Sequence, residues 1–281
     1  MVINKKKVFV LGLDSIPPEL LFDRWLDQLP NLKRLISNSV YGEMESTIPA
    51  ITCPAWMSMM TSVNPGRLGI YGFRNRSSYD YDGLSFVNSK VVKFNTVWDV
   101  LSKIGKKAVV IGVPMTYPPQ PLNGCMVTCF MTPDTNCDYT YPSELKNEVE
   151  TVTSGYMLDV DEFRSDNKDS ILKAIYEMTE KRFRLTRHFI RSKEWDFFMM
   201  VEMGPDRIHH AFWKYFDENH PKYTPGSKYR DAILDYYKYL DKEIGETFKL
   251  LDDDTLIIIV SDHGAKKMVG GICINEWLIQ N

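Results

Sequence analysis

Long apolar runs without a period of two set the pattern of this chain. In each run apolar residues follow one another directly, as they do in strands that are buried on both faces of a parallel sheet. Half-buried strands would instead alternate apolar and polar positions. Four runs have this form: 7–14, 108–113, 196–204 and 255–262. We predict that they are strands of one sheet.

Amphipathic stretches lie between these runs. Their apolar residues recur three and four positions apart, which is the spacing that lines one face of a helix. The predicted helices cover residues 30–39, 96–104, 169–195 and 229–254. Gly105 directly after the second of them suits a helix C-cap. The alternation of strands and helices predicts an α/β fold with a central, mostly parallel sheet sandwiched between helices.

Residues 120–165 interrupt this alternation. They are rich in Pro, Asn, Asp and Gly, and we expect an irregular insertion or cap there. The 281 residues, with 44% hydrophobic and 25% charged residues, suit one large catalytic domain over 1–281. The final "NEWLIQN" reads as a helix cut while still running, so we expect the natural chain to be longer.

Charge and cysteine content narrow the class of protein. The net charge is −3 and no basic stripe appears, which disfavours a nucleic acid polymer as partner. The apolar run at 8–13 is too short for a signal peptide or a membrane span, so we expect a cytoplasmic protein without membrane contact. The five cysteines are odd in number and scattered, which argues against a disulfide framework. Cys125 and Cys129 lack a second pair and are expected to pack rather than bind zinc.

Polar groups follow three of the predicted strands. Asp14 ends the first, "GPDRIHH" (204–210) follows the third, and "SDHG" (261–264) follows the last. In open α/β sheets ligands bind outside the carboxyl ends of the strands. Carboxylates that meet there repel one another unless a cation lies between them. The three strand ends together therefore predict a metal site.

The residue types at these strand ends suit a divalent cation. Asp262 and His263 can both turn toward one site where the strand ends. Asp206 and His210 lie at i and i+4, on one face of a helix if "PDRIHHAFW" is helical. Imidazole and carboxylate without cysteine favour zinc, with manganese or iron as alternatives. Taken singly, an aspartate such as Asp14 is more often a helix cap, and a histidine such as His210 is more often a surface or core residue. Asp262–His263 alone could equally form a turn.

The best candidate nucleophile is Thr52. It precedes a predicted helix, "AWMSMMTS", and Pro49 and Pro54 lie on either side of it. A hydroxyl at a helix N-terminus lies near free N–H groups that suit an incoming phosphate or sulfate. The alternative is that Thr52 only caps the helix. Cys53 is the rival nucleophile, but no basic residue lies near it in sequence.

Four motifs in this order resemble the alkaline phosphatase superfamily, in its type I phosphodiesterase/nucleotide pyrophosphatase family. They are "VLGLDS" (10–15), "STIPAITCPAWMSMMTSVNPGRLGIYGF" (46–73), "GPDRIHHAFW" (204–213) and "VSDHGA" (260–265). The resemblance implies an alkaline phosphatase-like sheet, two divalent ions, usually zinc, and a covalent phospho-threonine intermediate. It implies one ion held by Asp14, Thr52, Asp262 and His263. It implies a second ion held by Asp206 and His210.

The chain departs from the family at two points. The second ion usually takes a further histidine downstream of "SDHG", and no histidine follows His263. His220 and Glu276 are weak substitutes. Nucleotide pyrophosphatases also carry an asparagine three residues after the nucleophile, where this chain has Ala55.

Substrate contacts are harder to read from the sequence. Arg67 and Arg74 are candidates for binding phosphate, or else solvated charges of a loop. The sulfatase motif C/S-x-P-x-R is not matched around Cys53, which disfavours sulfate ester hydrolysis.

The function expected from the sequence is metal-dependent hydrolysis of a small phosphate ester. The resemblance favours a phosphodiesterase that acts through Thr52. The alternatives are a phosphomonoesterase or phosphotransferase on the same scaffold. A third alternative is a catalytically incomplete metal- or ligand-binding domain that lacks a full second metal site.

Overall fold

The computed structural model describes residues 7–78 and 83–281. Their centre is a six-stranded sheet with the strand order β6-β5-β4-β7-β1-β8. The strands are β1 (Lys7–Leu13), β4 (Ala108–Ile111), β5 (Gly124–Val127), β6 (Thr140–Tyr141), β7 (Phe197–Glu202) and β8 (Thr255–Val260). All neighbouring pairs are parallel except β5 and β6, which are antiparallel. The fold class predicted from the sequence is confirmed.

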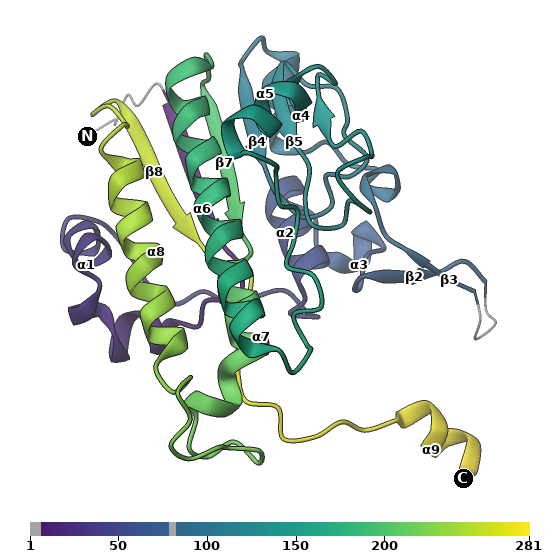
Figure 1. Ribbon diagram of the computed structural model, residues 1–281. Helices are drawn as coiled ribbons and strands as arrows, with labels where there is room; N and C mark the ends of the chain where they lie inside the picture. Colours follow the sequence, from purple (N-terminus) through teal and green to yellow (C-terminus); the bar gives the residue numbers. More distant parts are fainter. Residues whose placement is uncertain (1–6, 79–82) are drawn as a thin grey trace.

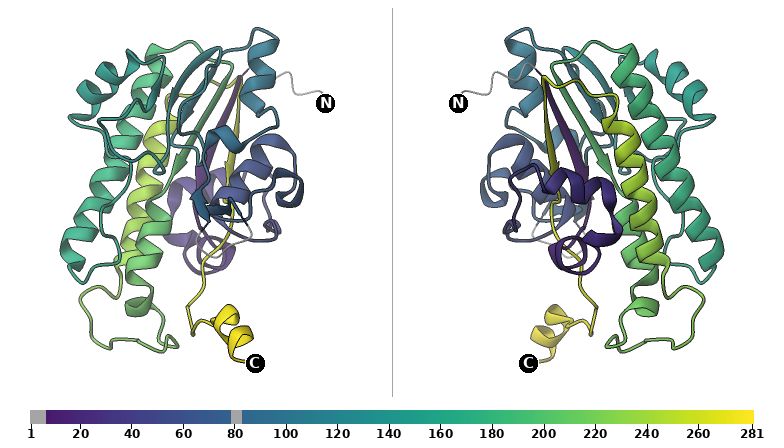
Figure 2. Two further views of the ribbon diagram at one scale, coloured as in Figure 1. Left: turned by 90° about the vertical axis from the view of Figure 1, so that its right-hand side faces the viewer. Right: turned by 90° about the vertical axis from the view of Figure 1, so that its left-hand side faces the viewer.

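Helices cover both faces of this sheet (Figure 1). One face carries α5 (Leu145–Thr153), α6 (Lys168–Ser192), α7 (Gly204–Phe216) and α8 (Ala232–Phe248). The other carries α2 (Thr52–Thr61) and α4 (Val97–Lys103), as the edge-on views in Figure 2 show. The short α1 (Pro30–Ile36) contacts α8 through Asn31 and Leu32, which both bond to Asp241.

Small elements complete the described chain. Four short helical elements are η1 (Glu19–Arg24), η2 (Leu26–Gln28), α3 (Pro65–Leu68) and η3 (Ser89–Val91). The hairpin of β2 (Arg74–Arg76) and β3 (Leu84–Phe86) projects from the body, and α9 (Ile274–Gln280) lies away from it at the end of an extended segment (Figure 1). Among the described residues, no helix has both the length and the apolar character needed to cross a membrane.

The interruption expected at 120–165 is only partly irregular. Two strands of the main sheet, β5 and β6, and the helix α5 lie within it. The prediction of an irregular segment was therefore wrong for these elements. Strands of four and two residues leave too short an apolar run to be recognised by periodicity.

The strand β8 also differs from the expectation of burial on both faces. Leu256 and Ile258 are each 41% exposed, whereas every residue of β7 is buried. The difference arises because β8 lies at the edge of the sheet and β7 lies inside it. An apolar run in the sequence does not reveal this position.

Candidate metal centre

Polar residues that follow three strands meet at the carboxyl ends of these strands. The strands β7, β1 and β8 are neighbours in that order, and β1 is parallel to both others. Asp14 follows β1, and Asp262 and His263 follow β8. Asp206 lies in the first turn of α7, which begins just after β7. The topology of the sheet thus brings together groups that are far apart in the sequence.

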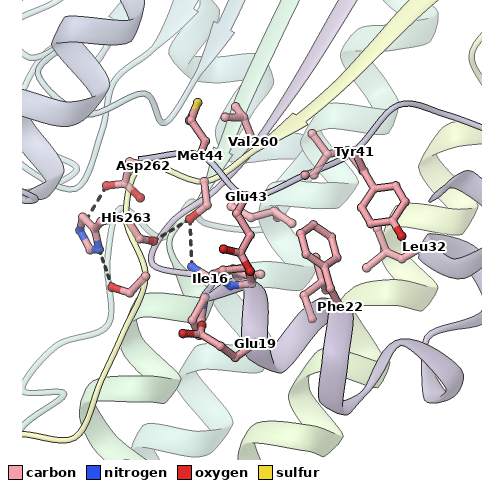
Figure 3. A pocket seen from close by; sticks show the side chains of 18 of the residues that line it. Ile16, Glu19, Phe22, Leu32, Tyr41, Glu43, Met44, Val260, Asp262 and His263 are labelled. Atoms are coloured by element: carbon pink, nitrogen blue, oxygen red, sulfur yellow. Dashed lines mark hydrogen bonds and ion pairs between the residues drawn. The ribbon is translucent and has the colours of Figure 1, made fainter. Parts of the chain in front are cut away.

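Asp14, Asp262 and His263 form a tight cluster. One ligand atom from each lies within 4.8 Å of the others. Nε2 of His263 is 3.2 Å from Oδ2 of Asp262 and 4.0 Å from Oδ1 of Asp14. Nδ1 of His263 lies 3.0 Å from the carbonyl oxygen of Gly264, and a hydrogen bond donated there leaves Nε2 as the ligand atom. Figure 3 shows Asp262 and His263 facing each other.

Thr52 joins the cluster from α2. Its hydroxyl oxygen lies 3.2 Å from Nε2 of His263. The N-cap of α2 is Ile51, and no side chain makes a capping hydrogen bond there. The alternative interpretation of Thr52 as a simple cap was therefore wrong. The rival Cys53 is fully buried, and burial raises the pKa of its thiol well above the usual range, so the thiol stays protonated.

Two carboxylate oxygens of the cluster are available as ligands for a cation. Within the described part of the chain, Oδ1 of Asp14 and Oδ2 of Asp262 are buried without a hydrogen-bond partner. The other oxygen of each carboxylate is fixed, by Trp56 Nε1–H at 2.8 Å and by Ser15 N–H at 3.1 Å. Buried acceptors without a partner are costly, and a cation would satisfy both. Two carboxylates, one imidazole and one hydroxyl are a donor set that suits zinc or manganese.

Electrostatics lead to the same conclusion. Burial, and then repulsion from Asp262 and Asp206, raises the pKa of Asp14 well above its usual value. Burial raises the pKa of Asp262 to about 7. Both carboxyl groups therefore resist ionisation in the metal-free protein, and a positive charge between them would relieve that resistance.

Close packing of α2 on β1 holds Asp14 in place. A Cβ atom at Gly12 would lie 2.5 Å from the Trp56 ring, so only glycine lets that ring cross the strand. The same ring donates its N–H to Asp14. Trp56 lies one helical turn after Thr52, which places both side chains on one face of α2. Trp56 is not among the residues predicted from the sequence, although its spacing from Thr52 could have indicated it.

Asp206 and His210 form a separate pair beside the cluster. Oδ1 of Asp206 lies 3.4 Å from Nε2 of His210. Burial acts to raise the pKa of Asp206, but the His210 hydrogen bond and the Arg207 charge hold it below its usual value. The neighbouring His209 is buried against Tyr237, with Nε2 3.0 Å from its hydroxyl, and burial lowers its pKa to about 3. The structure thus brings His210, and not His209, to Asp206.

The remaining sequence candidates lie elsewhere. Arg67 and Arg74 are exposed and stack on Phe94 and Phe86, 5.7 and 4.8 Å from the ring centres. Their contacts favour the alternative of solvated loop charges. His220 lies in the turn after α7, where Nδ1 accepts the N–H of Lys222.

Glu276 is exposed on α9, away from the body (Figure 2). Within the described residues, Asp14, Asp262 and His263 are the one group with three ligands, so neither His220 nor Glu276 completes a second one.

A pocket of about 760 Å³ opens beside the cluster. It extends from Asp262 and His263 to Phe22, Leu32 and Tyr41, as Figure 3 shows. Its walls come from η1, α1, the loop at 37–46 and the strand β8. The surface on this side of the cluster is mostly apolar.

Comparison with known proteins gives one family. The model of the family described as type I phosphodiesterase / nucleotide pyrophosphatase matches residues 8–281. No curated protein matches the chain.

Solved structures share the fold at low sequence identity. Phosphonoacetate hydrolase from Sinorhizobium meliloti, in complex with phosphonoformate, has a TM-score of 0.59 and 18% identity over 93% of this chain. Human ectonucleotide pyrophosphatase / phosphodiesterase 5 has a TM-score of 0.53 and 15% identity over 92% of this chain. The lipoteichoic acid synthase of Listeria monocytogenes has a TM-score of 0.53 and 13% identity over 94%. This chain spans 57% of the length of the first two and 58% of the third.

Proposed function

Because the chain belongs to the type I phosphodiesterase/nucleotide pyrophosphatase family of the alkaline phosphatase superfamily, we propose that it hydrolyses small phosphate esters with the help of divalent cations, and prefers diesters. One observation carries the proposal. The Thr52 hydroxyl lies 3.2 Å from His263, beside two buried carboxylate oxygens that lack a hydrogen-bond partner in the described chain. Nucleophile and cation ligands thus lie next to each other.

Two cations, with zinc the first choice, are proposed for this centre. Asp14, Thr52, Asp262 and His263 would hold one, and Asp206 and His210 would supply ligands to the other. When bound, such ions lower the pKa of a coordinated hydroxyl and neutralise charge on the phosphoryl group.

The protein's own groups would then perform the transfer. Thr52 is the first residue of α2, so the free N–H groups of that helix end can bind a phosphoryl oxygen. The Thr52 hydroxyl loses its proton and its oxygen bonds to phosphorus, while the bond from phosphorus to the leaving oxygen breaks and that oxygen takes up a proton to give the alcohol. Water then hydrolyses the phosphothreonine ester, which releases phosphate, or a phosphate monoester from a diester, and restores the hydroxyl.

The test compares Thr52→Ala with Thr61→Ala. Thr61 lies on the same helix, and among the described residues its hydroxyl bonds only within α2, donating to the Met57 carbonyl oxygen at 2.6 Å. With zinc or manganese added, we expect Thr52→Ala to lose roughly a thousandfold or more of bis-p-nitrophenyl phosphate hydrolysis and Thr61→Ala to keep it. Equal rates for Thr52→Ala and the unmodified protein would refute Thr52 as nucleophile. Faster cleavage of p-nitrophenyl phosphate than of the diester would favour a phosphomonoesterase.

A second candidate is a metal-binding domain without turnover. One observation favours it: Asp206 and His210 are two ligands without a third among the described residues. Elemental analysis separates the two candidates, since two ions per chain support the hydrolase, whereas one ion without turnover supports the binding domain.

A further inference from the structure

Arg207 is a buried arginine next to Asp206 and His210, the ligands proposed for the second cation. Its side chain is 7% exposed, and it belongs to the first turns of α7. Nε and Nη2 donate to the two carboxylate oxygens of Asp159 at 2.6 and 2.7 Å. Nη1 donates to Oδ2 of Asp206. The guanidinium therefore donates hydrogen bonds to two carboxylates at once.

Two aromatic rings pack against the guanidinium. Its central carbon lies 4.4 Å from the ring centre of Phe163 and 5.2 Å from that of Phe130. Asp159 itself is anchored, because Oδ1 accepts the N–H of Val160 at 2.8 Å. An arginine that bonds to two carboxylates and packs against two rings has little freedom to turn toward a substrate.

This arrangement divides the two oxygens of Asp206. Oδ2 is taken by Arg207, and Oδ1 lies 3.4 Å from Nε2 of His210. The ring of His210 in turn lies 5.7 Å from Phe163, tilted by 56°. Asp206 Oδ1 and His210 Nε2 thus face a common point, while the groups behind them belong to one packed unit of Arg207, Asp159 and Phe163.

We propose that Arg207 is a positioning residue for the second cation, and that Asp159 holds Arg207 for this task. The inference rests on the proposed function, since it requires that Asp206 and His210 share a cation. Groups that orient a ligand from behind commonly change metal affinity by about ten- to a hundredfold. They are especially needed here, because the described chain supplies two ligands and no third at this point.

Two other roles for Arg207 fit the geometry less well. A phosphate-binding arginine presents free N–H groups to the pocket, but three nitrogens of Arg207 are already bonded to carboxylates. A purely structural ion pair between Asp159 and α7 would not need the contact with Asp206. That contact is what ties Arg207 to the candidate ligand.

The test uses Co²⁺ binding to the metal-free full chain, followed by visible absorption and by competition with a chelator. Arg207→Lys keeps the positive charge, but one ammonium group cannot span Asp159 and Asp206. Asp159→Ala removes the anchor and lets the guanidinium turn onto both oxygens of Asp206. We expect both variants to bind one of two cobalt equivalents about ten- to a hundredfold more weakly and the other equivalent as before.

Arg187→Lys is the matched control. Arg187 forms a comparable half-buried ion pair, 2.6 Å from Glu243, but joins α6 to α8 away from the centre. We expect unchanged binding of both equivalents in this variant. Wild-type affinity for both equivalents in Arg207→Lys and Asp159→Ala would overturn the positioning role and leave the proposed function standing. Fewer than two equivalents in the unmodified protein would instead overturn the two-cation centre, and the inference with it.

Discussion

Replacing Asp262 with asparagine should stabilise the metal-free protein at alkaline pH, although it removes a candidate ligand. In the metal-free fold Oδ1 of Asp262 accepts the N–H of Ser15, whereas Oδ2 is buried without a hydrogen-bond partner in the described chain. Asparagine keeps the first contact and removes a negative charge beside Asp14. The substitution thus removes a buried charge that has only the His263 ring, 3.2 Å from Oδ2, beside it among the described residues.

The size of the effect follows from the pKa of Asp262. Burial raises this pKa from 3.8 to about 7. A difference of about three pKa units at 1.36 kcal/mol each corresponds to at most about 4 kcal/mol. Because the folded-state pKa lies above the unfolded one, stability is fully present below pH 3.8 and is lost as the pH rises to 7. The advantage of Asp262→Asn should therefore be near zero around pH 4 and reach its full value at pH 8.

Urea unfolding with excess chelator, at acidic and alkaline pH, measures this difference. Asp241→Asn is the control, because the Asp241 carboxylate is equally buried but accepts N–H groups of Leu32 at 2.8 Å and Asn31 at 3.2 Å. That variant should be less stable than the unmodified protein. Asp262→Asn should lose its advantage when zinc is added, since the unmodified site then gains a counterion. A less stable Asp262→Asn at pH 8, or a difference that does not change with pH, would refute the reasoning.

Two further substitutions test the supports of the centre. Trp56→Phe keeps a ring over Gly12 but removes the N–H that bonds to Asp14 at 2.8 Å, so zinc affinity in chelator competition should fall about tenfold. Wild-type affinity would contradict the support. His209→Gln should shift acid unfolding to lower pH, because burial lowers the pKa of His209 to about 3 and its contribution is lost as the pH falls below 6.5. An unchanged midpoint of acid unfolding would contradict a neutral core histidine.

Long elements could be predicted from the sequence because burial leaves a continuous apolar run in a strand and a helical period in a helix. The apolar runs at 7–14 and 196–204 became β1 and β7, and the helical spacing at 169–195 became α6. The short strands β5 and β6 were not predicted, because four and two residues are too few to show a pattern. Their surroundings are also rich in turn-forming residues. The edge position of β8 could not be predicted, because the order of strands in a sheet depends on the tertiary fold.

The candidate centre has two halves, one of Asp14, Asp262 and His263 and one of Asp206 and His210. They differ in how far the sequence could reveal them. Asp14, Asp262 and His263 follow long strands, and the rule that ligands gather at carboxyl ends of strands is enough to group them. Asp206 and His210 were predicted as a pair from their helical spacing. Asp159 and Phe163 gave no signal, because they lie in an irregular segment and reach Arg207 only through the folded chain.

This difference also indicates how each half is held. The Asp14–Asp262 half is fixed by backbone: Asp14 and Asp262 follow paired strands, and the Ser15 N–H bonds to Asp262. The Asp206–His210 half depends on side chains, because Arg207, Asp159 and Phe163 come together from a helix and an irregular segment. Strands paired along six residues move less readily than side chains of a loop. The first half is therefore set by strand pairing, and the second depends on the packing of Asp159 and Phe163 against Arg207 of α7.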